Sequence, residues 1–302
     1  MKVAALDLGS NTFLCLIAEV EKKAITKIYA DLIDVVRLGQ DVEKTKLLNP
    51  DALLRAEAAL KKFKAVIDVH RPEKILAMAT SAARDAKNQN ELFKIAEKFN
   101  IPIEIIPGSE EARITFNGSM SGQISEGKRL IVDIGGGSTE FIAGDLIKIE
   151  TSKSLNIGCV RLTEKFITSQ PTSGDEVIQL EKIISKSFEQ LSEFEHIKID
   201  EMLAVAGTPT SLAAAEIGAF DAEKIEGYFL TTESLLAWKN KLQKWTLEEK
   251  IKNGIPAGRA DVILVGVLIL LETLKKFKHN KIKVSTRGVR HGIALEMAFR
   301  SS

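Results

Sequence analysis

The stretch Leu130-Ile-Val-Asp-Ile-Gly-Gly-Gly-Ser-Thr-Glu-Phe-Ile-Ala143 decides the fold class of this chain. Two short apolar runs, 130–134 and 139–143, flank three consecutive glycines, a pattern typical of two strands joined by a tight turn. The segment therefore predicts a β-hairpin. If Gly136 and Gly137 form a two-residue turn, Asp133 lies directly opposite Glu140 on the same face of the hairpin.

These opposed acids need a positive charge between them. Directly opposed residues in an antiparallel pair have Cβ atoms about 4.5–5.5 Å apart, where like charges are destabilising. A divalent cation, Mg²⁺ or another, held by Asp133 and Glu140 together with a substrate phosphate would relieve the repulsion. The glycine backbone can approach phosphate oxygens closely, and the hydroxyl of Ser138 adds a donor. The alternative is an ordinary hairpin with its acids in solvent, which this matched set of features disfavours.

The same theme opens the chain. The segment Val3–Leu8 predicts a strand, Gly9-Ser10-Asn11 a turn and 12–19 a second strand, with Asp7 in the position that Asp133 takes later. Strand, aspartate, glycine-containing turn and strand thus recur about half a chain apart, which indicates an internal duplication at the scale of a domain. Alone, the first loop is equally an ordinary hairpin turn, and its significance comes from the second loop.

Strands and helices are interleaved along the rest of the chain, which predicts an α/β fold. Strands are expected at 27–29, 74–78, 103–106, 202–206 and 281–285, and helices at 50–69, 91–99, 174–195, 232–245, 260–276, 288–299 and from residue 110 onward. The small polar residues of 121–127 indicate a domain boundary. We therefore expect an N-terminal domain 1–122, completed by the C-terminal helix 286–302, and a C-terminal domain 123–285.

Two adjacent acids, Glu110 and Glu111, lie in the first turn of a predicted helix after Gly108-Ser109. Acids at that position are stabilised by the helix dipole without any catalytic role. Alternatively, one of them activates a water molecule, because a carboxylate kept ionised by the helix end is available as a general base at neutral pH. The residues themselves leave both interpretations open.

An arginine, Arg84, ends the segment Thr80-Ser-Ala-Ala-Arg that follows a predicted buried strand. Its guanidinium group is suited to a bidentate contact with phosphate. A salt bridge with Asp85 or with another neighbour is an equal alternative.

A third loop, Ala206-Gly207-Thr208-Pro-Thr210, lies where a predicted strand leads into a helix. Backbone N–H groups at such a junction favour an anion. When the loop is taken alone, capping of the helix by Thr208 or Thr210 is the simpler interpretation.

Composition narrows the possible partners. The chain has 302 residues with 42 Lys+Arg and 41 Asp+Glu, a net charge of +1, which gives no reason to expect binding to nucleic acid or to a membrane. Cys15 and Cys159 are expected to be buried free thiols. No signal peptide is evident, and the longest apolar run, 262–271, is too short to span a bilayer, so we expect a cytoplasmic protein.

Several motifs occur in one order along almost the whole chain. They are Asp7-Leu-Gly-Ser-Asn-Thr12, Thr80-Ser-Ala-Ala-Arg84, Gly108-Ser-Glu-Glu-Ala-Arg113, Asp133-Ile-Gly-Gly-Gly-Ser-Thr-Glu140, Gly158-Cys-Val-Arg-Leu-Thr163, Ala206-Gly-Thr208 and Arg259-Ala-Asp261. In this combination the chain resembles the short, two-domain form of the Ppx/GppA family, the exopolyphosphatases and guanosine pentaphosphate phosphohydrolases.

The resemblance implies a fold and a set of roles. The fold would be two RNase H-like domains of the actin/Hsp70/sugar-kinase superfold flanking a cleft. Glu111 would be the catalytic base, Asp133 and Glu140 would hold Mg²⁺, and Arg84 would bind substrate. Phosphate would be bound by loop residues, namely Asp7, Gly9, Ser10, Asn11, Thr12, Gly135, Gly136, Gly137, Ser138, Gly207 and Thr208. Such proteins are commonly homodimers.

The function that follows is release of terminal orthophosphate from inorganic polyphosphate, guanosine pentaphosphate or both. The sequence does not choose between these substrates. Two alternatives remain: a phosphotransferase resembling acetate and sugar kinases, and an actin-like nucleotide-binding module. One departure from the family pattern, His291 in the place of an acid, has no role that the sequence assigns.

Overall fold

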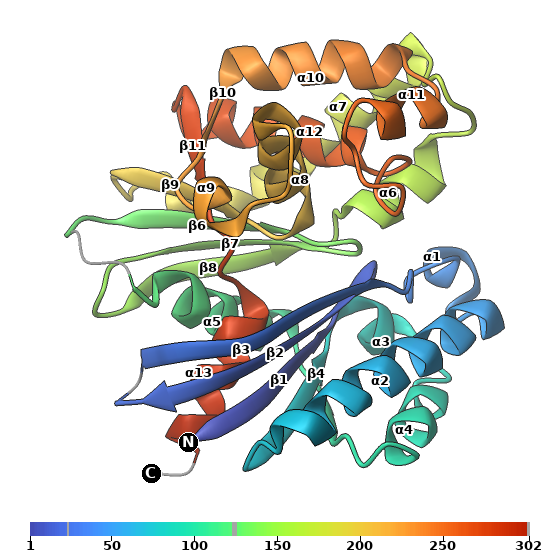
Figure 1. The fold of residues 1–302 in the computed structure, drawn as a ribbon. Helices are drawn as coiled ribbons and strands as arrows, with labels where there is room; N and C mark the ends of the chain where they lie inside the picture. Colours follow the sequence, from blue (N-terminus) through green and yellow to red (C-terminus); the bar gives the residue numbers. More distant parts are fainter. Residues whose placement is uncertain (23, 123–125, 301–302) are drawn as a thin grey trace. The chain divides into compact units, whose positions relative to one another are not determined.

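The computed structural model describes residues 1–22, 24–122 and 126–300. By its contacts the chain forms two compact units, Met1–Ile124 with Arg287–Ser302, and Ser125–Thr286 (Figure 1). The predicted domain boundary after residue 122 falls at 123–125, which lie outside the described residues. The division into domains 1–122 with 286–302 and 123–285 stays a prediction.

The first unit is built on a mixed five-stranded sheet with the order β3-β2-β1-β4-β5. Three antiparallel strands form one side of it, and two parallel strands extend it from β1. Their bounds are β1 (Lys2–Leu8), β2 (Thr12–Glu21), β3 (Ala24–Val35), β4 (Lys74–Ala79) and β5 (Ile103–Ile105).

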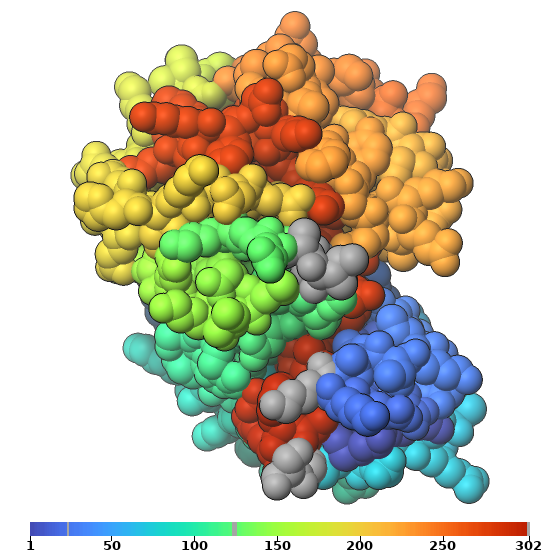
Figure 2. Space-filling model, turned by 90° about the vertical axis from the view of Figure 1, so that its left-hand side faces the viewer, coloured from blue at the N-terminus to red at the C-terminus, as the bar shows by residue number. Residues whose placement is uncertain are grey.

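Helices cover both faces of this sheet because β1 buries both sets of its alternating side chains. Ala4 and Leu6 pack with one group of helices, α1 (Val42–Thr45), α2 (Pro50–His70), α3 (Ser81–Asp85) and α4 (Asn90–Glu97). Val3 and Ala5 pack with a second group, α5 (Gly108–Met120) and α13 (Val289–Phe299). The last helix therefore completes the first unit, and Figure 2 shows its red surface beside the blue β2–β3 segment.

The second unit is built on a six-stranded sheet with the order β10-β11-β9-β6-β7-β8. Here too an antiparallel three-stranded meander is extended by two parallel strands, and an antiparallel strand forms the far edge. The bounds are β6 (Arg129–Ile134), β7 (Thr139–Gly144), β8 (Ile149–Leu155), β9 (Glu201–Val205), β10 (Phe229–Thr231) and β11 (Lys281–Val284). The two sheets thus share a hairpin-plus-parallel-strand plan, as the predicted duplication requires.

One hydrophobic core joins the helices of the second unit to Leu130, Val132 and Ile134 of β6. The helices are α6 (Cys159–Phe166), α7 (Gly174–Phe188), the 3₁₀ segment η1 (Glu189–Phe194), α8 (Gly207–Ile217), α9 (Ala222–Ile225), α10 (Thr232–Lys244) and α12 (Ile263–Lys276). Helix α11 (Leu247–Lys252) contributes no side chain to this core. The apolar run 262–271 lies in buried α12. Within 1–22, 24–122 and 126–300, no helix is long and apolar enough to cross a membrane.

Most expected elements are present, and the differences have physical causes. Edge strand β8 was not predicted, because its sequence Ile-Glu-Thr-Ser-Lys-Ser-Leu lacks an apolar alternation. Edge strand β3 extends well beyond the expected 27–29. The prediction was too short because this sequence, too, lacks a regular apolar alternation. Helix α12 begins at Ile263 rather than at residue 260. Both cysteines are buried and free, as predicted.

Candidate functional site

Two carboxylates face each other on the sheet of the second unit. Asp133 of β6 pairs directly with Glu140 of β7, so the predicted register is confirmed. Both side chains are buried, with 5% and 1% of their surface exposed. They lie on the face opposite to Val132, whose side chain packs in the helical core.

The row of polar side chains extends one strand further. Ser154 of β8 lies opposite Glu140, and its hydroxyl donates to Glu140 Oε1 at 2.7 Å. Sequence analysis missed Ser154 because it missed β8. The turn after Gly144 would not have been enough, because a register shift between Ala143 and Gly144 moves the pairing by one residue and so places Ser154 opposite Glu140.

The glycine turn between the two acids is held by helix α6. The Gly135 N–H donates to Ser138 O at 3.0 Å, which closes the turn. Its carbonyl oxygens then accept from α6: Cys159 N–H donates to Gly135 O (3.0 Å), Val160 N–H to Gly136 O (2.9 Å), and Arg161 Nε to Gly137 O (2.7 Å). Gly158 has to be glycine, because a Cβ there would lie 2.4 Å from Gly136 O.

This arrangement orients the N–H groups of the turn. In a trans peptide the C=O group and the following N–H group point in opposite directions. Because the carbonyls of residues 135–137 are turned toward α6, the N–H groups of residues 136–138 point away from it. Successive N–H groups aimed one way form a concave anion site. The turn is therefore suited to hold a phosphate beside Asp133.

The loop at Gly9 has the same closing bond. Its N–H donates to Thr12 O at 3.2 Å, and Asp7 takes the place of Asp133, while Leu14 takes the place of Glu140. The carbonyls of this turn are also used: Ser10 O accepts from Gly39 N–H (2.7 Å) and Asn11 O from the backbone of residues 36–37. The first loop thus repeats the anion-binding geometry without the second acid.

The third loop begins helix α8 with a strained residue. Ala206 has φ 71° and ψ −163°, a region that is essentially restricted to glycine, and it makes no side-chain cap. Helix capping by a threonine is wrong here, because the Thr210 hydroxyl donates back to Ala206 O (2.9 Å) and Thr208 Oγ1 lies 3.4 Å from Cys159 Sγ. The contact with Cys159 links Gly207-Thr208 to the helix that holds the glycine turn.

The first unit carries the remaining predicted residues. Glu111 lies in the first turn of α5, 7% exposed, and Arg84 Nη1 lies 3.3 Å from Glu111 Oε2. The same nitrogen of Arg84 donates to Ile106 O at 2.7 Å. Arg84 therefore forms the salt bridge that was the alternative prediction, with Glu111 as its partner. The Ser10 hydroxyl accepts from Ala82 N–H at 3.1 Å, which joins the first loop to the helix that carries Arg84.

Asp133 and Glu140 can offer two carboxylate ligands to a hard cation whose remaining ligands are water or phosphate oxygens. Among the described residues, no group of three or more His, Cys, Asp or Glu side chains forms a complete metal cage. Mg²⁺ is usually held by one or two carboxylates, with water and phosphate oxygens completing its octahedron. Asp133 and Glu140 therefore suit Mg²⁺ bound together with a phosphorylated substrate better than a permanent structural metal.

Comparison with known proteins identifies the family. The model of the Ppx/GppA phosphatase family matches residues 16–301. The chain belongs to this family. It is 36% identical, over 97% of its length, to the bifunctional 3-dehydroquinate synthase/phosphatase of Fusobacterium nucleatum, of which it spans 46%. It is 31% identical to exopolyphosphatase 2 of Mycobacterium tuberculosis, with 98% of both chains covered.

A solved Ppx/GppA structure shares the fold. The Aquifex aeolicus family member superposes with a TM-score of 0.83 at 30% identity, covering 100% of this chain and 99% of that one. The predicted α/β class with actin-like, RNase H-like units is confirmed. Ppx/GppA membership makes the chain a hydrolase of phosphoanhydride bonds and does not favour the kinase or binding-module alternatives.

Proposed function

We propose that the chain releases terminal orthophosphate from inorganic polyphosphate, from guanosine pentaphosphate, or from both, with the help of Mg²⁺ or another divalent cation. The observation that carries the proposal is the buried Asp133–Glu140 pair beside a turn whose N–H groups are aimed for an anion. The relative named exopolyphosphatase 2, matched over 98% of both chains, supports polyphosphate as a substrate.

In the second unit, Asp133 and Glu140 would hold the cation. The cation, when bound, neutralises charge on the phosphoryl group that is transferred. The N–H groups of residues 136–138 bind phosphate oxygens, and Gly207-Thr208 supplies further donors at the start of α8. Ser154 orients Glu140 by donating its hydroxyl to Oε1 of the carboxylate.

In the first unit, Glu111 accepts the proton of the attacking water. Arg84 contacts the phosphate oxygens on which negative charge accumulates, and its present bond to Glu111 holds the two side chains in place. Asp7 and the loop residues 9–12 bind the phosphate chain by the geometry they share with the second loop. Positioning and electrostatics supply most of the rate enhancement in phosphoryl transfer.

The proposal extends to the oligomeric state of the protein and its cellular compartment. We propose a cytoplasmic homodimer, because the family resemblance implies a dimer and two buried free thiols fit a reducing compartment. Polyphosphate and guanosine pentaphosphate share a terminal phosphoanhydride, so parallel rates on short polyphosphate, long polyphosphate and guanosine pentaphosphate would rank them.

The test of the mechanism is Glu111→Gln. Removing the base should lower kcat for phosphate release by about 10²- to 10⁴-fold, while binding of polyphosphate survives. Phosphate release and binding are measured on the same preparation. The matched control is Glu91→Gln, which changes an exposed first-turn glutamate of α4 and should leave kcat unchanged. Turnover near that of the wild type in Glu111→Gln would exclude Glu111 as the base.

A further inference from the structure

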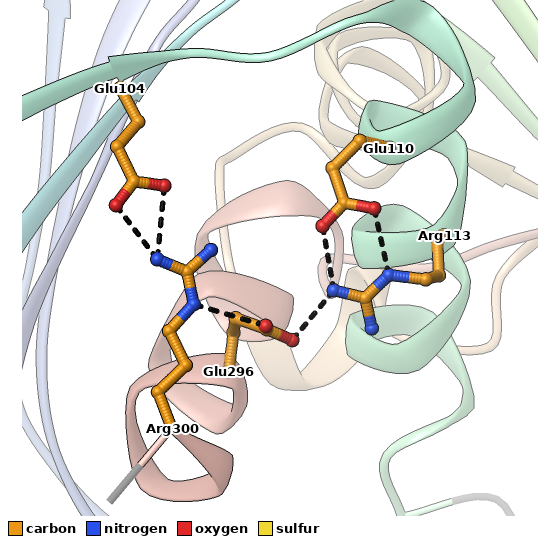
Figure 3. A network of polar contacts seen from close by, with 5 residues as sticks. All are labelled: Glu104, Glu110, Arg113, Glu296 and Arg300. Atoms are coloured by element: carbon orange, nitrogen blue, oxygen red, sulfur yellow. Dashed lines mark hydrogen bonds and ion pairs between the residues drawn. The ribbon is translucent and has the colours of Figure 1, made fainter.

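Five charged side chains of the first unit form one network that the proposed mechanism does not use. Figure 3 shows them: they come from β5, α5, α13 and the residue that follows α13, and these elements are far apart in sequence. The members are Glu104, Glu110, Arg113, Glu296 and Arg300.

Arg113 joins the first turn of α5 to α13. Its Nε donates to Glu110 Oε2 at 2.9 Å and its Nη2 to Glu110 Oε1 at 2.7 Å. The same Nη2 donates to Glu296 Oε2 on α13 at 2.7 Å. A lysine could not make this set of bonds, because the two nitrogens of the guanidinium fork are used at once.

Glu296 is in turn held from its other side. Its second oxygen, Oε1, accepts from Arg300 Nε at 3.2 Å. Arg300 Nη1 reaches both carboxylate oxygens of Glu104 on β5, at 2.7 and 3.0 Å. Glu296, only 13% exposed at its side chain, is thus the carboxylate that connects α5 to the anchored end of α13.

The start of α5 is held by the contacts of Arg84 with Ile106 O and Glu111 and not by a side-chain cap. Its N-cap residue is Pro107, and no side chain caps the helix. Uncapped first turns leave backbone N–H groups without intrahelical partners and are prone to fray. Further along, α5 contacts α13 backbone to backbone, because a Cβ on Gly118 would lie 2.2 Å from Gly288 O. Helix α13 is therefore the fixed surface against which α5 is placed.

We propose that Arg113 and Glu296 are positioning residues that set the place of Glu111. Glu110 and Glu111 are adjacent in the first turn, and their side chains point about 100° apart around the helix. Holding Glu110 through Arg113 on the α13 side therefore fixes the direction in which Glu111 extends toward Arg84. The inference rests on the proposed role of Glu111 as the base.

The role is kinetic rather than a matter of stability. Arg113 is 39% exposed and Glu110 30% exposed at the side chain, and ion pairs at such exposure contribute little to folding. A displacement of a catalytic group by about 1 Å, in contrast, can cost about 10²-fold in rate. The network should therefore affect kcat more than the melting temperature.

The experiment compares Arg113→Lys and Glu296→Gln with a matched control on the same helix. Arg290 of α13 pairs with Asp31 of β3 through two bonds of 2.8 Å each, so Asp31→Asn also removes one carboxylate that holds α13 but does not touch α5. Rates are taken per mole of folded protein. We expect kcat to fall about tenfold in Arg113→Lys and Glu296→Gln. KM should stay within about twofold of the wild type, and Asp31→Asn should keep the wild-type kcat.

Two results would overturn the inference. One is a kcat in Arg113→Lys and Glu296→Gln equal to that of Asp31→Asn. The other is a loss of total activity that is fully explained by a smaller amount of folded protein, which is the result expected for a purely structural ion pair. The parallel Glu111→Gln variant separates the two proposals: if it stays active the proposed base is wrong, and if it alone is inactive only the positioning role fails.

Discussion

At the scale of single residues, strand register made some contacts of the candidate site predictable, whereas contacts between distant segments were not. The opposition of Asp133 and Glu140 could be predicted because a two-residue turn leaves one pairing only. The Arg84–Glu111 contact could not, since the two residues lie 27 positions apart on separate helices and nothing local encodes their distance. The same holds for Thr208 and Cys159, 49 positions apart.

His291, to which the sequence assigned no role, is a buried part of helix α13. It is 4% exposed, and its Nδ1 accepts from Gly288 N–H at 3.4 Å at the start of the helix. A nitrogen that accepts a hydrogen bond carries no proton. Burial first, and then the positive charges of Arg290 and Arg287, hold the pKa of His291 well below its usual 6.5.

This neutral histidine should make stability depend on pH. Above pH 6.5, the ordinary value, His291 is neutral in both states and contributes nothing. As pH falls below that value the unfolded chain gains a proton that the folded chain refuses, so the free energy of unfolding falls. Urea unfolding at pH 7.5 and at pH 5 should show a loss up to about 2 kcal/mol larger in the wild type than in His291→Asn. Equal losses in the two proteins would contradict this account.

At the scale of elements, the pair α5–α13 is the feature that local sequence could least predict. The two helices come from opposite halves of the chain and cross with their backbones in contact. Interior elements with strong apolar periods, such as α2 and α12, were predicted well, whereas the edge strands β3 and β8 were not. Almost no residue of β3 or β8 is fully buried, so neither strand has the buried face that would produce a period-two signal.

The crossing gives a prediction about packing. A Cβ on Gly292 would lie 2.0 Å from Ile114 O, so Gly292→Ala must push α13 away from α5. The free energy of unfolding should fall by about 1–3 kcal/mol, as measured by denaturant titration. Gly174→Ala is the control, because its Cβ would meet no atom closer than 3.9 Å. That variant should be neutral or up to about 1 kcal/mol more stable. Similar losses in both variants would show that the crossing is not close.

At the scale of the whole molecule, the chain repeats one plan in two units that carry different proposed site residues. Each unit has the same antiparallel meander extended by parallel strands, and each closes its loop with the same backbone bond. The second unit carries the opposed carboxylates, and the first carries Glu111 and Arg84. The duplication was evident in the sequence because strand, aspartate and glycine turn recur. The difference between the two loops was not evident, because Leu14 occupies the place of Glu140 without altering the strand pattern.

The central claim is that water attacks the terminal phosphorus of a polyphosphate chain. The most direct test is to incubate the wild-type protein with polyphosphate and Mg²⁺ in H₂¹⁸O without any phosphate acceptor. We expect orthophosphate to be released with one ¹⁸O atom in each molecule, and release to stop when the cation is chelated. Release that requires an acceptor, or orthophosphate that carries no label, would contradict the account.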